Sequence, residues 1–281
     1  MKNYGLNLVL ERQEQKLEDW VFGSSGKECL ALIPSHEREE YLPKGEVQRA
    51  IEDTMDCASR GPLNILEAKF TWLYRNKKLS TENHLWLMEN GYVDLERRVT
   101  FSDAFVAINS LTTREGNSLR APLDAIRKHG LIPKKLLSLE SWMTWEDYHD
   151  PQRITPRLKK LGQEFAQRFF INYEKVYEKD FEALLEKDFL NVAGFAWPDE
   201  IDGVFYRTSL DPNHCFIVWK TPKYYAFDNY TDSDGDFIKR LAPDYDLMDY
   251  GYRVMITGEG KRTKKSCLGA VTNFIKEIFT K

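Results

Sequence analysis

The spacing of apolar positions changes along the chain. In the first two thirds, apolar residues recur at steps of three and four, which is the period of an amphipathic helix. After residue 188 the period becomes two, and Pro, Asn, Asp and Gly separate the apolar runs, as in strands joined by turns. Helices first and strands second predict an α+β protein with a helical lobe and a sheet lobe. We expect a functional site in the cleft between these lobes.

The helical half is predicted to hold several helices. One covers 58–76 and another covers 119–129. The segment 157–187 also has the pattern of long helical material, and we interpret its aromatic residues as core. Pro62 fits a helix only in or just before its first turn, which favours a helix start a few residues after Cys57.

The sheet half is predicted to hold strands at 190–195, 203–208, 215–220, 223–228 and 251–257. Both halves together form the predicted main domain, 48–257, with the helical lobe at about 48–187 and the sheet lobe at about 188–257. Residues 258–281 are predicted to be a basic linker and an amphipathic helix, which docks either onto this body or onto a partner.

The N-terminal residues 1–47 have a pattern of their own. Apolar residues alternate near the start, and a Gly/Ser cluster at 23–26 marks a turn or linker. Two interpretations are open. The segment is either an arm that lies over the cleft, as an inhibitory prosegment does, or an edge strand and loop packed on the body.

Composition and charge exclude several classes of function. The 281 residues carry 40 Lys and Arg against 44 Asp and Glu, so no basic excess exists to bind a phosphate backbone, and we expect no nucleic acid as primary partner. No apolar run approaches the ~20 residues of a membrane helix. The first residues lack the pattern of a secretory signal peptide.

The cysteines are widely spaced, at Cys29, Cys57, Cys215 and Cys267. This spacing argues against a disulfide framework and against a zinc cluster, and it fits a reducing compartment. Cys57 stands out because it lies between a polar turn and the start of a helix, where unpaired N–H groups and the helix dipole lower a thiol pKa. It is either a nucleophile or an ordinary buried cysteine.

A second candidate group lies in the sheet half. His214 begins an apolar strand, where an imidazole can face a cleft and act as general base. A predicted hairpin returns the chain beside it, so that Asp228 or Asn229 can orient the ring. A thiol, an imidazole and an orienting group are what acyl transfer by cysteine requires. This chemistry needs no metal and no organic cofactor.

The order of these segments resembles papain-like cysteine peptidases. The matching segments are Asp56-Cys57-Ala58-Ser59, Arg114-Glu115-Gly116-Asn117-Ser118, Asn213-His214-Cys215 and Phe227-Asp228-Asn229-Tyr230. The resemblance implies a two-lobed fold and hydrolysis of peptide bonds in a peptide or protein substrate.

The same resemblance implies roles for further residues. The turn of Gly116, Asn117 and Ser118 would bind an extended peptide through its backbone, and Gln48 with the Cys57 amide would stabilise the oxyanion. Gln48 lies nine residues before Cys57, whereas the family glutamine usually lies six before, so Gln48 needs an extra loop to reach. Asp56 places a negative charge beside the sulfur, which raises a thiol pKa unless His214 is protonated.

A narrower resemblance concerns the source. The segments Asp19-Trp20-Val21-Phe22-Gly23, Leu42-Pro43-Lys44-Gly45-Glu46-Val47-Gln48 and Gly116-Asn117-Ser118-Leu119 are similar to papain-like proteins encoded by bacteriophages. This implies the host cytoplasm or the virion as location, and other virion proteins as partners. Two alternatives stay open: a virion structural protein whose site is weak or unused, and a hydrolase of cell-wall peptide bonds.

Overall fold

The computed structural model describes residues 4–14, 20–45, 47–197, 200–208, 210–219, 224–231 and 235–260. The helices are α1 (Leu8–Glu14), α2 (Arg38–Tyr41), α3 (Cys57–Arg75), α4 (Thr81–Glu89), α5 (Asp103–Asn109), α6 (Ala121–His129), α7 (Trp145–His149), α8 (Pro156–Arg168) and α9 (Phe181–Leu185). Short 3-10 turns lie at Lys134–Leu136, Pro151–Arg153 and Glu178–Asp180. The strands are β1 (Phe169–Tyr177), β2 (Leu190–Gly194), β3 (Glu200–Ile201), β4 (Val204–Phe205), β5 (His214–Val218), β6 (Tyr225–Phe227), β7 (Ile238–Leu241) and β8 (Leu247–Glu259).

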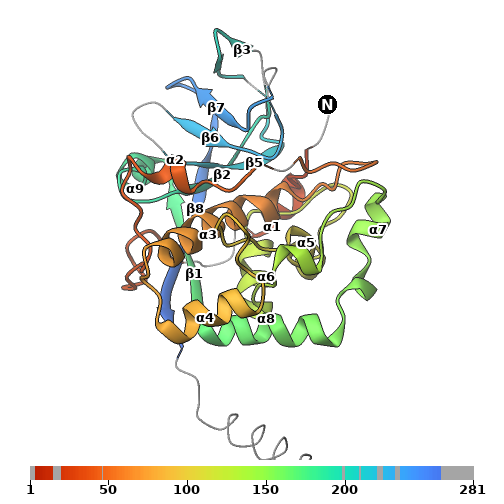
Figure 1. Cartoon of the computed structure of the whole chain (residues 1–281). Helices are drawn as coiled ribbons and strands as arrows, with labels where there is room; N and C mark the ends of the chain where they lie inside the picture. Colours follow the sequence, from red (N-terminus) through yellow and green to blue (C-terminus); the bar gives the residue numbers. More distant parts are fainter. Residues whose placement is uncertain are drawn as a thin grey trace, which may run out of the picture.

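The strands form one mixed sheet in the order β1-β8-β2-β5-β6-β7-β4-β3. All neighbouring pairs are antiparallel except β4 and β7. Figure 1 shows helices α4 to α8 together in the lower part of the molecule and the strands β3, β6 and β7 in the upper part, with α3 between them. The α+β prediction of a helical part and a sheet part is therefore confirmed.

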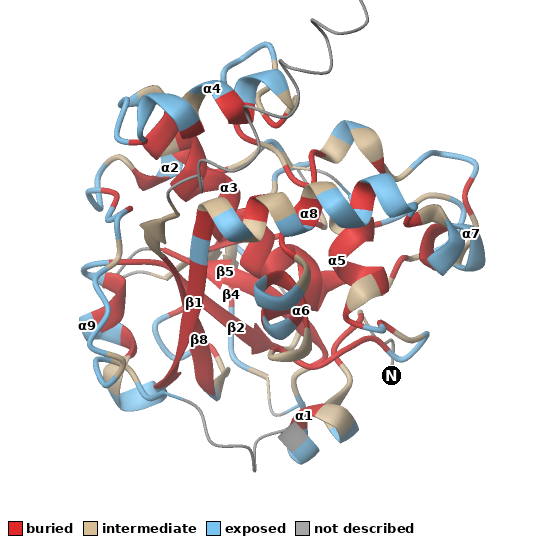
Figure 2. Cartoon of the chain, turned by 90° about the horizontal axis from the view of Figure 1, so that it is seen from below, coloured by how far each residue is buried: buried red, intermediate tan, exposed pale blue. Residues whose placement is uncertain are grey.

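Helix α3 is the central helix, and most of its residues are buried (Figure 2). It packs on the sheet through Gly61, where an added Cβ would lie 2.2 Å from Asn191 Oδ1 and 2.9 Å from Cys215 Sγ. Any larger residue at position 61 would therefore push the helix away from β2 and β5. The missing side chain sets the distance between the helix and the sheet.

The start of α3 differs from the prediction. The helix begins at Cys57 and not a few residues later, because the N–H groups of Ser59 and Arg60 both donate to the Asp56 carbonyl. Pro62 consequently lies in the second turn. The buried position of the helix explains why it tolerates this proline, since tertiary packing supplies most of the stability of a helix in a protein.

The prediction of helical structure over 157–187 was wrong at 169–177, whereas α8 before this stretch and α9 after it are helical. Helix α8 ends at Arg168, and β1 follows directly and pairs with β8 along its whole length. Aromatic and β-branched residues fill this strand, and they suit a pleated, paired surface. The predicted helical lobe, 48–187, therefore contains the first strand of the sheet. Strands β3 and β7 were not predicted, and the predicted strand at 203–208 contains only the two residues of β4.

The N-terminal segment contains a helix that the alternating pattern did not predict. The Asn7 side chain accepts hydrogen bonds from the N–H groups of Val9 and Leu10, and this cap starts α1. The predicted helix near the C-terminus lies outside the described residues. Across the described ranges, every helix is too short or too polar to cross a membrane.

A buried ionic cluster joins α3 to the sheet. Lys69, fully buried on α3, contacts Asp188 at 2.6 Å and donates to the Val254 carbonyl. Arg253 on β8 contacts the other oxygen of Asp188 at 3.0 Å. Glu174 also contacts Arg253, at 3.4 Å, so two carboxylates balance these two cations.

We expect Asp188→Asn to lower the free energy of unfolding by about 3–5 kcal/mol, because it leaves Lys69 buried without its anion. Urea denaturation followed by circular dichroism measures the loss. The matched control is Glu96→Gln, which breaks the exposed Lys44–Glu96 pair and should change stability by less than about 1 kcal/mol. A loss equally small for Asp188→Asn would contradict a structural role for this cluster.

Candidate active site

Cys57 lies where α3 meets the first residues of β5. It is the first residue of α3 and only 1% exposed. Its Sγ accepts a hydrogen bond from the backbone N–H of Cys215, the residue that follows His214 in β5. Two predicted site residues, Cys57 and His214, therefore lie at adjoining ends of neighbouring elements.

The imidazole of His214 is bound by Asp228. His214 Nε2 lies 2.5 Å from Asp228 Oδ1, and both side chains are buried. The alternative third residue, Asn229, points elsewhere and accepts a hydrogen bond from Asn64 on α3 at 3.0 Å. Of the two candidates left open by the sequence, the structure places Asp228 at the ring.

Asp228 has further partners on the sheet side. Trp197 Nε1 donates to Oδ2 at 2.6 Å, and the Lys239 ammonium lies 3.6 Å from the same oxygen. Burial by itself raises the pKa of the Asp228 carboxyl, but His214, Lys239 and the Asn229 N–H lower it, and the net shift is downward. The carboxylate is therefore held in its charged form beside His214 and Lys239.

Gln48 reaches the cleft through a closed loop. Residues 49–53 form a loop whose two ends lie side by side. Arg49 and Asp53 form an antiparallel bridge, and the Thr54 N–H donates to the Gln48 carbonyl at 3.1 Å. This is the extra loop that the longer spacing to Cys57 requires. The Gln48 side chain is buried, and its Nε2 donates to Asp53 Oδ1 at 3.1 Å and to the Tyr4 carbonyl at 3.3 Å.

The N-terminal segment lies in the cleft. The Tyr4 carbonyl oxygen lies 3.3 Å from Gln48 Nε2 and 3.3 Å from His214 Nδ1, and the Tyr4 N–H donates to the Asn213 carbonyl. Both neighbours of the His214 ring, the Asp228 carboxylate and this carbonyl, are hydrogen-bond acceptors. A backbone carbonyl of the chain itself therefore occupies the position between the imidazole and the glutamine.

The segment continues along the glycine turn. The Asn117 N–H donates to the Gly5 carbonyl at 2.9 Å, and the Asn7 N–H donates to the Asn117 carbonyl at 2.8 Å, so that Leu6 and Asn117 form a parallel bridge. Gly116 has a φ of +91°, and a Cβ there would lie 1.9 Å from the Gly5 oxygen. The turn binds an extended segment through its backbone, and this segment belongs to the same chain.

The side chains of this turn hold it in shape. The Asn117 amide donates to the Ser110 carbonyl and to Thr112 Oγ1, and the Ser118 hydroxyl accepts from the Ala121 N–H at the start of α6. The backbone of Asn117 is thus left to pair with the N-terminal segment.

The structure reverses the expected direction of the Cys57 pKa. Burial raises the pKa of the thiol, and the neighbouring Cys215, Asp56 and Asp228 act in the same direction, against a smaller lowering by the Cys215 N–H. The helix-entrance argument predicted the opposite. The sulfur is buried, and its raised pKa favours the neutral thiol.

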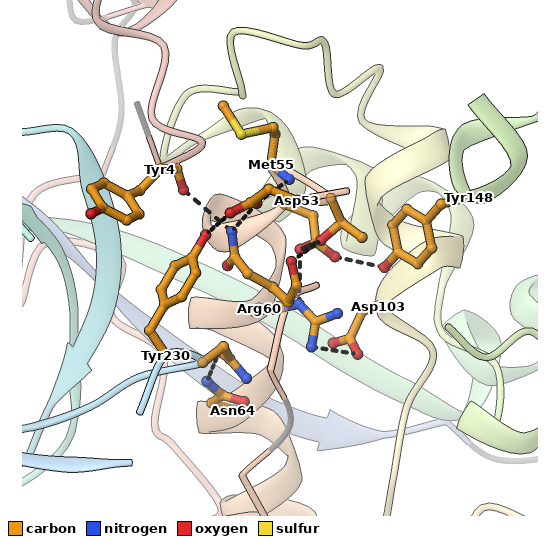
Figure 3. Close-up of polar contacts among 12 residues, drawn as sticks. Tyr4, Asp53, Met55, Arg60, Asn64, Asp103, Tyr148 and Tyr230 are labelled. Atoms are coloured by element: carbon orange, nitrogen blue, oxygen red, sulfur yellow. Dashed lines mark hydrogen bonds and ion pairs between the residues drawn. The ribbon is translucent and has the colours of Figure 1, made fainter. Parts of the chain in front are cut away.

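Asp56 anchors the residues before Cys57 to the helical part. Its carboxylate accepts from Arg60 Nε at 2.8 Å, from Thr54 Oγ1 at 2.6 Å and from the Tyr148 hydroxyl at 2.6 Å. Arg60 also contacts Asp103 at 3.3 Å, and Figure 3 shows Tyr148 and Asp103 directed toward this group. Burial raises the pKa of Asp56, but Arg60 and the hydrogen bonds together lower it by more, so the net shift is downward.

Several contributors to the site were not predicted from the sequence. They are Tyr4, Asp53, Trp197, Tyr230 and Lys239. Lys239 had a weak signal, because it occupies a buried position of the alternating strand β7 where an apolar residue is usual. Among the described residues, no group of three or more His, Cys, Asp or Glu side chains is arranged to hold a metal ion.

No protein-family model matches the chain, and no curated protein matches it significantly. Solved structures do. Xylellain, a cysteine protease from Xylella fastidiosa, is 14% identical, with 92% of this chain and 96% of that chain covered and a TM-score of 0.52. The proform of cathepsin B S9 from Trypanosoma congolense is 9% identical, with 92% and 87% covered and a TM-score of 0.54.

A third similar structure is digestive procathepsin L2 from the larval midgut of Tenebrio molitor, at 11% identity, with 90% of this chain and 78% of that chain covered and a TM-score of 0.51. At these identities the likeness concerns the fold. The chain has the papain-like fold of cysteine proteases, as the sequence resemblance predicted.

We expect Asp56→Asn to lower the free energy of unfolding by about 3 kcal/mol at pH 7, because it removes the anion of the buried Arg60. The lowered pKa means that this stabilisation is present above the unfolded-state pKa of about 3.9 and is lost as pH falls through the folded-state value. The difference from wild type should therefore shrink at pH 3. Urea titrations at both pH values measure it.

Thr54→Val is the comparison variant: it removes one hydroxyl donor to the same carboxylate but keeps the Arg60 pair, and it should cost about 1.5 kcal/mol, the lower end for a hydrogen bond to a charged group. A pH-independent difference between Asp56→Asn and wild type would contradict the ionised state assigned to Asp56.

Proposed function

We propose that this protein is a cysteine peptidase that hydrolyses peptide bonds with Cys57 as nucleophile. The observation that carries the proposal is the position of the Tyr4 carbonyl, which is hydrogen-bonded to the Gln48 amide and lies against the His214 ring. Cysteine-dependent acyl transfer needs the peptide carbonyl of the substrate in this place, between the oxyanion donor and the imidazole. The papain-like fold supports the same reaction class.

The steps follow from the groups present. Cys57 gives its proton to His214, and the thiolate attacks the carbonyl carbon of the substrate. The developing oxyanion accepts hydrogen bonds from Gln48 Nε2 and from the Cys57 backbone N–H. His214 then donates its proton to the leaving amine as the C–N bond breaks, which leaves a thioester. Water attacks the thioester while His214 accepts the proton of the water, and the acid product and the thiol are released.

Asp228 would orient His214 throughout. Its Oδ1 holds Nε2, so that Nδ1 is directed to the Tyr4 carbonyl, the place proposed for the substrate carbonyl. Trp197, Lys239 and the Asn229 N–H fix the carboxylate in turn. The Tyr230 ring packs edge-on against His214 at 5.1 Å and limits how the ring can turn.

The N-terminal segment would act as an intramolecular block. Its residues occupy the backbone of the glycine turn and the space beside Gln48, so a substrate cannot enter while they stay. Two of the similar structures are proforms by name, which supports assigning a prosegment-like role to residues 1–47. The main domain would then begin near residue 48.

A catalytically unused papain fold is the second candidate function. The shielded, neutral Cys57 and the occupied cleft favour it. The bacteriophage setting, with other virion proteins as partners and the host cytoplasm or virion as location, belongs to this proposal and rests on the sequence resemblance. Hydrolysis of cell-wall peptide bonds uses the same chemistry on another substrate.

We expect the full chain to hydrolyse fluorogenic peptides and to lose all turnover in Cys57→Ala. His214→Ala should lose nearly all of it, and Gln48→Ala should lower kcat/KM by about 10²–10³-fold, because one oxyanion donor is removed. Asn64→Ala, which removes a contact to Asn229 and none to the reacting groups, is the control. Turnover that survives Cys57→Ala would contradict Cys57 as the nucleophile. No turnover with any peptide or cell-wall fragment, even after the N-terminal segment is displaced, would favour the second candidate.

Leu6→Asp is expected to raise the initial rate of hydrolysis at least about tenfold. Leu6 is 3% exposed in the cleft, and a buried unpaired carboxylate there costs several kcal/mol, so the segment should leave the cleft. Val9→Asp is the matched control, since Val9 follows closely and is 66% exposed. A peptidase equally active with and without Leu6→Asp would show that the segment does not block the site.

A further inference from the structure

Asp53 lies among the hydrogen bonds that surround Gln48 (Figure 3). Its Oδ1 accepts from Gln48 Nε2 at 3.1 Å and from the Met55 backbone N–H at 2.9 Å. Its Oδ2 accepts from the Tyr230 hydroxyl. Donors from both sides of the cleft therefore fix this carboxylate, because Gln48 and Met55 precede α3 whereas Tyr230 follows Asp228.

The orientation of the Gln48 amide decides whether it can act. An amide has a donor side and an acceptor side of nearly equal shape, and rotation by 180° exchanges them. Only the N–H side stabilises a negatively charged oxygen. In the structure one N–H points to Asp53 and the other to the Tyr4 carbonyl. The Gln48 Oε1 is buried and accepts no hydrogen bond from the described residues.

Asp53 distinguishes the two orientations. An ionised carboxylate accepts hydrogen bonds and never donates them. If the Gln48 amide rotated, its Oε1 would face Asp53 Oδ1 with no hydrogen between the two oxygens. The pairing with Asp53 therefore favours the orientation in which the second N–H faces the cleft.

We propose that Asp53 is a positioning residue that holds the Gln48 amide with its N–H toward the reacting carbonyl. The inference rests on the proposed function. The loop 49–53 has two effects: it brings Gln48 to the Tyr4 carbonyl, which also lies at His214, and it ends in the carboxylate that orients the amide. The Tyr230 hydroxyl and the Met55 N–H also donate to Asp53, so that three donors in all hold its carboxylate in place.

The test compares two reactions of Cys57 in the full chain. Hydrolysis of a fluorogenic peptide passes through an oxyanion, whereas alkylation by chloroacetamide forms an S–C bond, releases chloride and forms no oxyanion. Both reactions need an open cleft and a thiolate. The ratio of kcat/KM to the alkylation rate constant therefore isolates the oxyanion step, and it does not change if a variant merely loosens the N-terminal segment.

Asp53→Ala should lower this ratio about tenfold or more, up to the loss expected for Gln48→Ala. Asp53→Asn should keep it within about threefold, because the Met55 N–H holds an acceptor oxygen at the Oδ1 position, which still binds Gln48. Glu52→Ala is the matched control and should leave the ratio unchanged, because it removes the neighbouring carboxylate, which contacts Arg114 and not Gln48. If Asp53→Ala does not fold, Asp53→Leu has a similar shape and carries the same expectation.

The double variant decides between positioning and a general structural effect. In a Gln48→Ala background, Asp53→Ala should lower the ratio no further, because it acts through the missing amide. An unchanged ratio in Asp53→Ala, or an equal loss with and without Gln48, overturns the proposal. A wild-type chain that is alkylated at Cys57 but hydrolyses no peptide overturns the proposed function itself, which is a different result.

Discussion

The close contact of α3 with β5 is the interaction on which the site depends. Gly61 allows the helix to approach until its backbone lies near Cys215 and Asn191, and one turn earlier Cys57 lies beside the start of β5. A nucleophile and an imidazole from segments more than 150 residues apart meet because of this packing distance. The contact buries apolar area and also sets the spacing that the chemistry needs.

Buried charge is balanced locally at each end of this contact. Asp188 is paired with Lys69, Asp56 with Arg60, and Asp228 with His214 and Lys239. Each carboxylate also accepts hydrogen bonds from its neighbours, and a hydrophobic side chain in its place could not accept them. Since breaking such a pair is costly, the pairs hold the loop before Cys57 and the strand behind His214 in one arrangement. In the described residues, the three cysteines are free thiols, so ionic pairs and packing do this work.

Local signals in the sequence were enough to predict part of the fold and of the candidate site. The positions of Cys57 at a helix start and His214 at a strand start follow from nearby turn residues and a change of period, and the structure places both there. Strand β1 was missed because its pairing with β8 is set by residues about 80 positions away. A local pattern cannot show that partner.

The electrostatics of the site were harder to predict. Lys239 acts on Asp228 only because β6 and β7 pair in one register, which a sequence pattern does not fix. The raised pKa of Cys57 comes first from burial and then from Cys215 and Asp228 of the sheet, and the helix-dipole argument could include neither. The role of residues near the N-terminus was left open for the same reason, since alternation of apolar residues does not say which surface they cover.

The contact between Gly5 and Gly116 limits how such a chain can change. Both glycines have positive φ, and a side chain at either one would collide with backbone. At position 116 the same missing side chain admits the N-terminal segment and any other extended peptide. A substitution at position 116 would therefore impair the binding of the N-terminal segment and the binding of another extended peptide together. Substitutions that weaken the block without weakening peptide binding have to lie in the N-terminal segment itself.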